Sequence, residues 1–188
     1  MSPRPRASQD DILDATLDLI AELGASGVTV DTVVAATGAS KATIYRHWGS
    51  RAKLIHAAFA RTQGLASEPD TGSIRDDLLM LVRQLVAYLN HRDRRRIYTS
   101  LVDAAARDPE LADLHLQNDR EGRAMFERAI RRAIDRGELS DDVDVRLFVE
   151  LVMAPFVYRS VITQVKVRQA DVEPLVDHVL AAFGPAQA

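Results

Sequence analysis

The sequence has no cysteine among its 188 residues, which excludes disulfides, thiolate nucleophiles and cysteine-bound zinc. It also lacks a long apolar run. The longest stretch without Asp, Glu, Lys or Arg is the 11 residues 178–188, whereas a membrane-spanning helix needs about 18 or more apolar residues. No apolar segment follows the two arginines of residues 1–6, so we expect no secretory signal, no membrane association and a cytoplasmic protein.

Common enzyme motifs are missing as well. There is no G-x-S-x-G, no glycine-rich phosphate loop and no H-E-x-x-H. None of the five histidines lies three or four residues from another, so a helix offers no histidine pair to a metal ion. His115 with Asp119 is the one thin possibility. We therefore expect a protein that is not an enzyme and that carries no cofactor and no metal.

Acidic residues are absent from residues 32–67, although the net charge of the whole chain is −3. This segment holds five Lys or Arg residues, whereas residues 7–40 hold six acids and no Lys or Arg. A composition with 47% hydrophobic residues is that of a folded protein, of one large or two small domains. The local excess of positive charge favours a polyanion as the partner of one face.

Apolar residues recur with a 3.6-residue period along most of the chain, and no convincing alternating run is present. We predict an all-α protein of about nine helices, with a candidate linker at residues 64–73. The first helix follows Ser8 and ends at Leu23, and the others are expected at residues 30–37, 41–48, 51–63, 74–91, 94–107, 109–136, 145–164 and 172–183.

The sharpest pattern lies in residues 29–48, where two short helices joined by Gly38-Ala39-Ser40 fit a helix-turn-helix. Gly38 tolerates the positive φ of the turn, Ile44 faces the core, and small residues let the second helix enter a major groove. Trp48 is expected to plug the core. The charged residues could instead be a solvated face, and Arg4 and Arg6 could be a loose tail or a minor-groove arm. The candidate DNA contacts are Thr29, Ser40, Lys41, Ala42, Thr43, Tyr45, Arg46, His47, Arg51 and Lys53.

Residues 29–51, TVDTVVAATGASKATIYRHWGSR, resemble the DNA-binding signature of the TetR/AcrR family of transcriptional repressors. The resemblance is specific over about the first 60 residues and elsewhere concerns architecture alone. Val34, Ala42, Trp48 and Arg51 depart from the commoner Ala, Gly, Phe and Lys. The resemblance implies a homodimer, a palindromic double-stranded DNA operator and a small-molecule inducer. It implies a helix-turn-helix domain at 1–50, a connecting helix at 51–64 and a ligand-binding and dimerisation domain at 65–188.

The segment 147–162 is apolar almost all round, which requires burial on more than one side. We expect this helix and the last one to form a four-helix interface with a second subunit, and Pro155 to bend the first of them. A single large core without dimerisation is the alternative. The expected interface residues are Leu151, Pro155, Tyr158, Ile162, Leu175, Val176, Val179, Leu180 and Phe183.

An inducer pocket is expected between the helices at 74–91, 94–107, 109–136 and 144–164, because ligand sites in helical proteins form between packed helices. The ligand should be largely apolar. Arg159 either pairs with a carboxylate such as Glu150 or Asp103, reaches solvent, or holds an anionic inducer group. A helical adaptor without DNA binding is the alternative function. The expected lining is Val82, Leu85, Leu89, Tyr98, Leu101, Val102, Phe126, Ile130, Phe148, Val152, Phe156 and Arg159.

Overall fold

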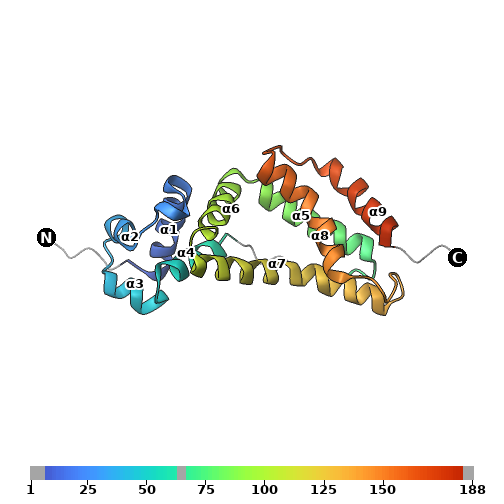
Figure 1. The fold of residues 1–188 in the computed structure, drawn as a ribbon, viewed down its shortest axis with the longest axis horizontal. Coiled ribbons are helices and arrows are strands. Elements are labelled where there is room, and N and C mark those ends of the chain that lie inside the picture. Colours follow the sequence, from blue (N-terminus) through green and yellow to red (C-terminus); the bar gives the residue numbers. More distant parts are fainter. Residues whose placement is uncertain (1–6, 63–66, 184–188) are drawn as a thin grey trace. The chain divides into compact units, whose positions relative to one another are not determined.

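The structure is a computed structural model that describes residues 7–62 and 67–183, and over these ranges it contains nine α-helices and no strand (Figure 1). The all-α prediction is confirmed. The helices divide into two compact units. The first comprises the described residues up to 62 together with 96–118, and the second comprises 67–95 together with 119–183. Residues 96–118 therefore pack with the N-terminal helices, although the expected boundary placed them in the C-terminal domain.

The first unit contains α1 (Gln9–Leu23), a 3-10 turn (Ala25–Gly27), α2 (Val30–Thr37), α3 (Lys41–Trp48) and α4 (Arg51–Ala60). Parts of α6 (Arg92–Ala105) and α7 (Pro109–Asp135) complete it. A Ser or Thr hydroxyl caps each of α1 to α4 by accepting a backbone N–H of the first turn, which satisfies a group that the helix leaves unpaired. The core consists of fully buried side chains that include Ile12, Ile20, Val33, Ile44, Leu54, Ile55, Phe59 and Leu101.

Helix α4 is shorter than expected. It ends at Ala60 instead of Gln63, and Arg61 and Thr62 form a turn in which their backbone N–H groups donate to Ala58 and Phe59. The Thr62 hydroxyl also donates to the Phe59 carbonyl, at 2.7 Å. This side chain-to-backbone bond competes with continuation of the helix.

The second unit contains α5 (Ile74–Asn90), the later part of α7, α8 (Val145–Val157), a π-helical turn (Tyr158–Ile162), a 3-10 turn (Gln169–Asp171) and α9 (Val172–Phe183). Helix α5 packs against both α8 and α9 (Figure 1). The α5–α9 packing is reinforced by ion pairs from Arg83 to Glu173 and from Arg75 to Asp177. The core includes Leu78, Val82, Val86, Ile130, Phe148, Val152, Phe156 and Val176.

Helix α8 does not continue to Gln164 as expected. Its α-helical part ends at Val157, and the following turn is π-helical, with the Thr163 N–H donating to the Tyr158 carbonyl at 3.0 Å. Pro155, inside α8, has no N–H to donate to the carbonyl four residues earlier. Two residues after this turn, Gln164 has a φ of 55°, in the left-handed region.

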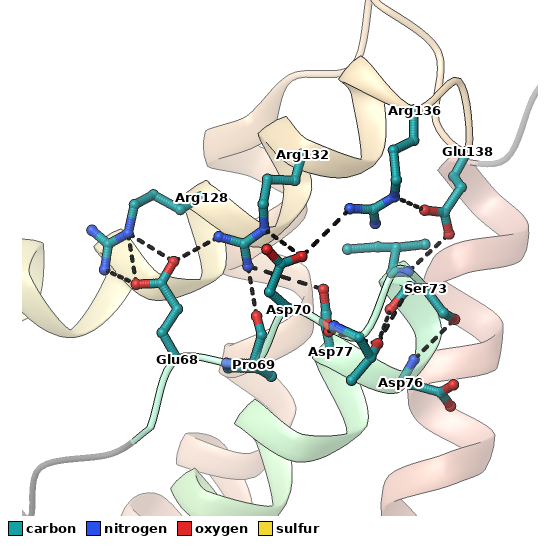
Figure 2. A network of polar contacts seen from close by, with 12 residues as sticks. Glu68, Pro69, Asp70, Ser73, Asp76, Asp77, Arg128, Arg132, Arg136 and Glu138 are labelled. Atoms are coloured by element: carbon teal, nitrogen blue, oxygen red, sulfur yellow. Dashed lines mark hydrogen bonds and ion pairs between the residues drawn. The ribbon is translucent and has the colours of Figure 1, made fainter.

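The segment before α5, part of the expected linker, is bound to α7 through residues 68–70 and to α5 through Thr71 and Ser73 (Figure 2). Glu68 accepts hydrogen bonds from Arg128 and Arg132, and Arg132 also donates to the Pro69 carbonyl at 2.6 Å. The fully buried carboxylate of Asp77 accepts from the backbone and the hydroxyl of Thr71, both at 2.8 Å. Residues 68–73 are thus a fixed part of the second unit.

Candidate nucleic-acid interface

Helices α2 and α3 form the predicted helix-turn-helix. Thr29 caps α2 in a reciprocal capping box with Thr32, and α2 ends at Gly38 in the left-handed conformation, with φ 72° and ψ 6°. Ser40 caps α3 by accepting the Thr43 N–H at 3.1 Å. Ile44 is fully buried, so the inner face of α3 is anchored in the core and its other face is left to solvent.

The candidate DNA contacts on this outer face are accessible. Tyr45 is 50% exposed, and Ser40, Lys41, Ala42, Arg46 and His47 are exposed as well. Thr29 and Lys53, the first before α2 and the second in α4, are also exposed. Thr43 is half-buried, and its hydroxyl lies 2.9 Å from that of Ser40. Arg4 and Arg6 lie outside the described residues.

Lys41 forms an ion pair with Asp31 of α2, at 2.6 Å. Both side chains are more than half exposed, so the pair adds little to stability. The hydrogen bond from Lys41 to Asp31 raises the pKa of Lys41 above its ordinary value. The Lys41 ammonium therefore stays charged. Because the Asp31 carboxylate is exposed, replacing it with a DNA phosphate as the partner of Lys41 costs little free energy.

His47 and Trp48 connect α3 to its surroundings. The Nδ1 atom of His47 lies 3.0 Å from the side-chain nitrogen of Gln9, at the start of α1, and Arg46 Nη2 lies 3.5 Å from its Nε2. Trp48 is half-buried and packs against the core of the first unit, as expected of a core plug. The end of α3 is therefore held by α1 and by the core.

Arg51, one of the candidate DNA contacts, forms hydrogen bonds within the protein. Its guanidinium donates to the carbonyls of Val28 and Ala25, both at 2.5 Å, and to the carboxylate of Asp108 at 3.2 Å. Its side chain is 28% exposed. The hydrogen bonds to these intramolecular partners use the Nε, Nη1 and Nη2 atoms of Arg51, so a structural role stands beside its assignment as a DNA contact, which stays a prediction. No role was predicted for its partner Asp108 from the sequence, although the position of Asp108 directly before Pro109 is typical of a helix cap.

Comparison with known proteins identifies the family. Residues 12–58 match a family model described as bacterial regulatory proteins, tetR family, and residues 68–179 match one described as tetracyclin repressor-like, C-terminal domain. The chain belongs to the TetR family of bacterial transcriptional regulators. As a member of a family of DNA-binding regulators, it is not an enzyme.

Individual relatives cover nearly the whole chain. An uncharacterized HTH-type transcriptional regulator of Mycobacterium tuberculosis is 36% identical over 181 residues, 95% of this chain and 87% of that protein. The DNA-binding transcriptional repressor TetR of Mycobacteroides abscessus is 31% identical over 160 residues, 79% of each protein. The crystal structure of the TetR family transcription regulator SCO0332 matches with a TM-score of 0.72 and 30% identity, over 94% of this chain and 98% of that one.

In this TetR-family regulator the expected inducer-pocket residues do not form one set. Tyr98, Leu101 and Val102 belong to the first unit, where the Tyr98 ring lies 6.4 Å from that of Phe59. Leu101 is buried in the core there, whereas Val102 is 38% exposed. Eight others belong to the core of the second unit, all buried except the half-buried Leu85: Val82, Leu85, Leu89, Phe126, Ile130, Phe148, Val152 and Phe156.

The structure has an open hollow of about 400 Å³ in the first unit, between the end of α1 and α6. It shares no residue with the expected pocket and is lined by Leu23, Arg96 and Ser100 among others. Within residues 7–62 and 67–183, no helix is long and apolar enough to cross a membrane, and no three His, Asp or Glu side chains are grouped for a metal ion.

Arg159 is half-exposed and pairs with Asp171, at 3.2 Å, instead of with Glu150 or Asp103. Glu150 is engaged by Arg146 and Arg123, and Asp103 by Arg107. Of the three alternatives for Arg159, a carboxylate partner is the one that the structure contains, and it comes from the 3-10 turn before α9. That turn is brought to Arg159 by the fold, and spacing along α8 could not indicate it.

The expected dimer-interface residues divide into exposed and buried groups. Leu151, Tyr158 and Ile162 expose 43%, 58% and 66% of their surface. Val176, by contrast, has no exposed surface and belongs to the core of its own subunit, because α9 lies on α5 and α8. Pro155 of α8 is half-buried. The others are half-buried against the same core: Leu175, Val179, Leu180 and Phe183.

Proposed function

We propose that this TetR-family regulator represses transcription in the cytoplasm as a homodimer bound to a palindromic operator, and that a small, largely apolar inducer releases it. The observation that carries DNA binding is the outer face of α3, which exposes Lys41, Arg46 and Tyr45 while Ile44 anchors the inner face. Two such helices, in a dimer, would enter successive major grooves about 34–36 Å apart.

The experiment for this step is enrichment of random DNA duplexes by the purified protein, followed by affinity measurement at several salt concentrations. The expected product is a palindrome whose half-sites are about one helical turn apart. Affinity should fall steeply with salt, because neutralised phosphates release counterions. Retention of no duplex, even at low salt, would refute the proposal in favour of an adaptor that binds only protein.

Dimerisation is supported by the exposed apolar side chains of α8 and its π-helical turn. Leu147, Leu151, Tyr158 and Ile162 follow spacings of four and seven residues, so they lie on one helical face. Exposed apolar surface of this kind marks contact with another protein. Isologous contact with the same face of a second copy would bury it in a two-fold dimer.

The proposed inducer site lies in the core of the second unit, along the inner face of α8 and its π-helical turn. Phe148, Val152, Phe156 and Ser160 recur every four residues and are fully buried. The Ser160 hydroxyl has no hydrogen-bond partner among the described residues. A buried hydroxyl without a partner is costly, so an apolar ligand with one hydrogen-bonding group would find both an apolar wall and a polar handle there.

The inducer proposal is tested by titrating aromatic and fatty acids against the operator-bound protein. For a compound that releases the wild type, Ser160→Ala should raise the required concentration about tenfold, because one buried hydrogen bond is lost. Arg159→Ala tests the anionic group separately. If both variants respond as the wild type does, the inducer group is held by other residues. If no apolar compound binds, the second unit serves dimerisation alone.

A further inference from the structure

The starts of α4 and α7 are joined through their capping residues. Ser50 caps α4 by accepting the Lys53 N–H at 3.1 Å, and the same hydroxyl donates to the carboxylate of Glu110, in α7, at 2.6 Å. Asp108 accepts the Glu110 N–H at 3.1 Å with one carboxylate oxygen and the Arg51 guanidinium with the other. Each cap therefore serves the other helix as well as its own.

Arg51 ties this junction to the chain that precedes the reading helices. Its Nε donates to the Val28 carbonyl, and its Nη2 donates to the carbonyls of Ala25 and Ser26. Residues 28 and 51 flank the helix-turn-helix on either side, so one guanidinium holds both ends of the segment 29–50. Its planar fork reaches these carbonyls and Asp108 at once, which a lysine ammonium on a single flexible stem cannot do.

The charges at the junction explain why Asp108 is needed. The first turn of a helix carries a partial positive charge, and here two first turns meet beside a guanidinium. Asp108 and Glu110 supply the negative charge that offsets this repulsion. Removing the charge of Asp108 leaves the junction with excess positive charge and Arg51 without its carboxylate.

We propose that Arg51 and Asp108 are positioning residues: they hold α2 and α3 against the start of α7 and set DNA affinity through geometry, without touching DNA. The proposal rests on the proposed DNA-binding function.

The test uses Arg51→Lys, Asp108→Asn and the double variant, with Arg107→Lys and Asp113→Asn as controls that make the same exchanges at exposed positions. Binding to a duplex selected by the wild type is measured over a salt series. We expect each junction variant to weaken binding about tenfold with an unchanged salt slope, and the double variant to be little weaker than either, as for one coupled unit.

The sign of the Asp108→Asn effect is decisive. Loss of a negative charge strengthens DNA binding by simple electrostatics, as the Asp113→Asn control should show in small measure, whereas the positioning role predicts weaker binding. The proposal is overturned if Asp108→Asn binds as well as the wild type, or if Arg51→Ala lowers the salt slope by about one phosphate contact.

A second readout needs no DNA. Amide hydrogen exchange over residues 29–48 should become about tenfold faster in Asp108→Asn than in Asp113→Asn, because local opening of α2 and α3 becomes easier. Unchanged exchange would overturn the positioning role even if Arg51→Lys proved too unstable to measure. If the wild type binds no duplex but Asp108→Asn still exchanges faster than Asp113→Asn, the proposed function is refuted, whereas the structural role of Arg51 and Asp108 is retained.

Discussion

The exposed face of α8 and its π-helical turn offers the sharpest test of assembly, through Ile162→Asp. Ile162 is 66% exposed, so within one subunit the change touches little of the core and should alter the stability of the folded chain by less than about 0.5 kcal/mol. A large effect of this substitution can therefore come only from contact with another molecule.

The expected magnitude follows from that exposed fraction. Full burial of an isoleucine stabilises by about 1.5–3 kcal/mol, so burying the exposed two thirds contributes about 1–2 kcal/mol. A two-fold interface contains the residue twice, which gives about 2–4 kcal/mol, or about 30- to 700-fold in the dimer dissociation constant. An unpaired aspartate in the interface adds its own desolvation cost, so these figures are a lower bound.

Sedimentation equilibrium over a range of protein concentrations measures this constant. Leu116→Asp is the matched control, since Leu116 is 51% exposed on α7 and lies outside the proposed interface. The wild type and the control should be dimers at micromolar concentration, and Ile162→Asp should be largely monomeric. A dimer of unchanged affinity in Ile162→Asp would refute the interface, and a monomeric wild type would refute dimerisation itself.

Three further predictions concern DNA contact, acid stability and backbone strain. Lys53→Ala should weaken binding to all duplexes alike and reduce the slope of log affinity against log salt by about 0.9; an unchanged slope would remove Lys53 from the phosphate contacts. Hydrogen bonds from two arginines of α7 lower the pKa of Glu68 from 4.5 to about 2, so its contribution to stability is present above pH 4.5 and lost as the pH falls towards 2. In urea unfolding, Glu68→Gln should cost about 1 kcal/mol at pH 7, after allowance for solvent screening, and nothing near pH 2; a constant difference would contradict the ion pair. Gln164→Gly should raise the free energy of unfolding by about 0.5–1 kcal/mol by relieving the positive φ, whereas Gln169→Gly should not, and equal effects would exclude strain as the cause.

The elements that could be predicted from the sequence are those that local interactions determine. Ser8 and Ser40 cap helices because their hydroxyls reach backbone N–H groups three residues away, and Gly38 ends α2 because its φ is positive. Such signals lie within a few residues of their effect. The order of the helices and the exposed face of α3 could therefore be read before any tertiary contact was known.

The elements that could not be predicted depend on neighbours distant in the chain. The apolar character of α8 and α9 indicates burial, but periodicity does not say which side of each helix meets a second subunit. The sequence therefore predicts Val176 of α9 at the interface, whereas it is fully buried in the core of its own subunit. Likewise the residue type of Tyr98, aromatic with a hydroxyl, is typical of a ligand pocket. Its ring instead packs against that of Phe59, 39 positions earlier in the chain, in the first unit. Apolar character predicts burial, and only the fold decides the partner.

Arg51 shows the same limit for charge. An arginine in an acid-free segment directly after a recognition helix is predicted to contact DNA. Lys53, two residues later, is predicted to contact a phosphate, and its exposure is consistent with that role. The two differ through residues 25–28 and Asp108, which supply oxygen atoms to Arg51 alone. A guanidinium in a partly buried ring of acceptors is held by geometry as well as charge, and its removal leaves those acceptors unpaired. We therefore propose that two cations close in sequence have different roles: Arg51 positions the reading helices, and Lys53 meets a phosphate. The salt slope of binding counts only phosphate contacts, so it is the measurement that separates the two roles.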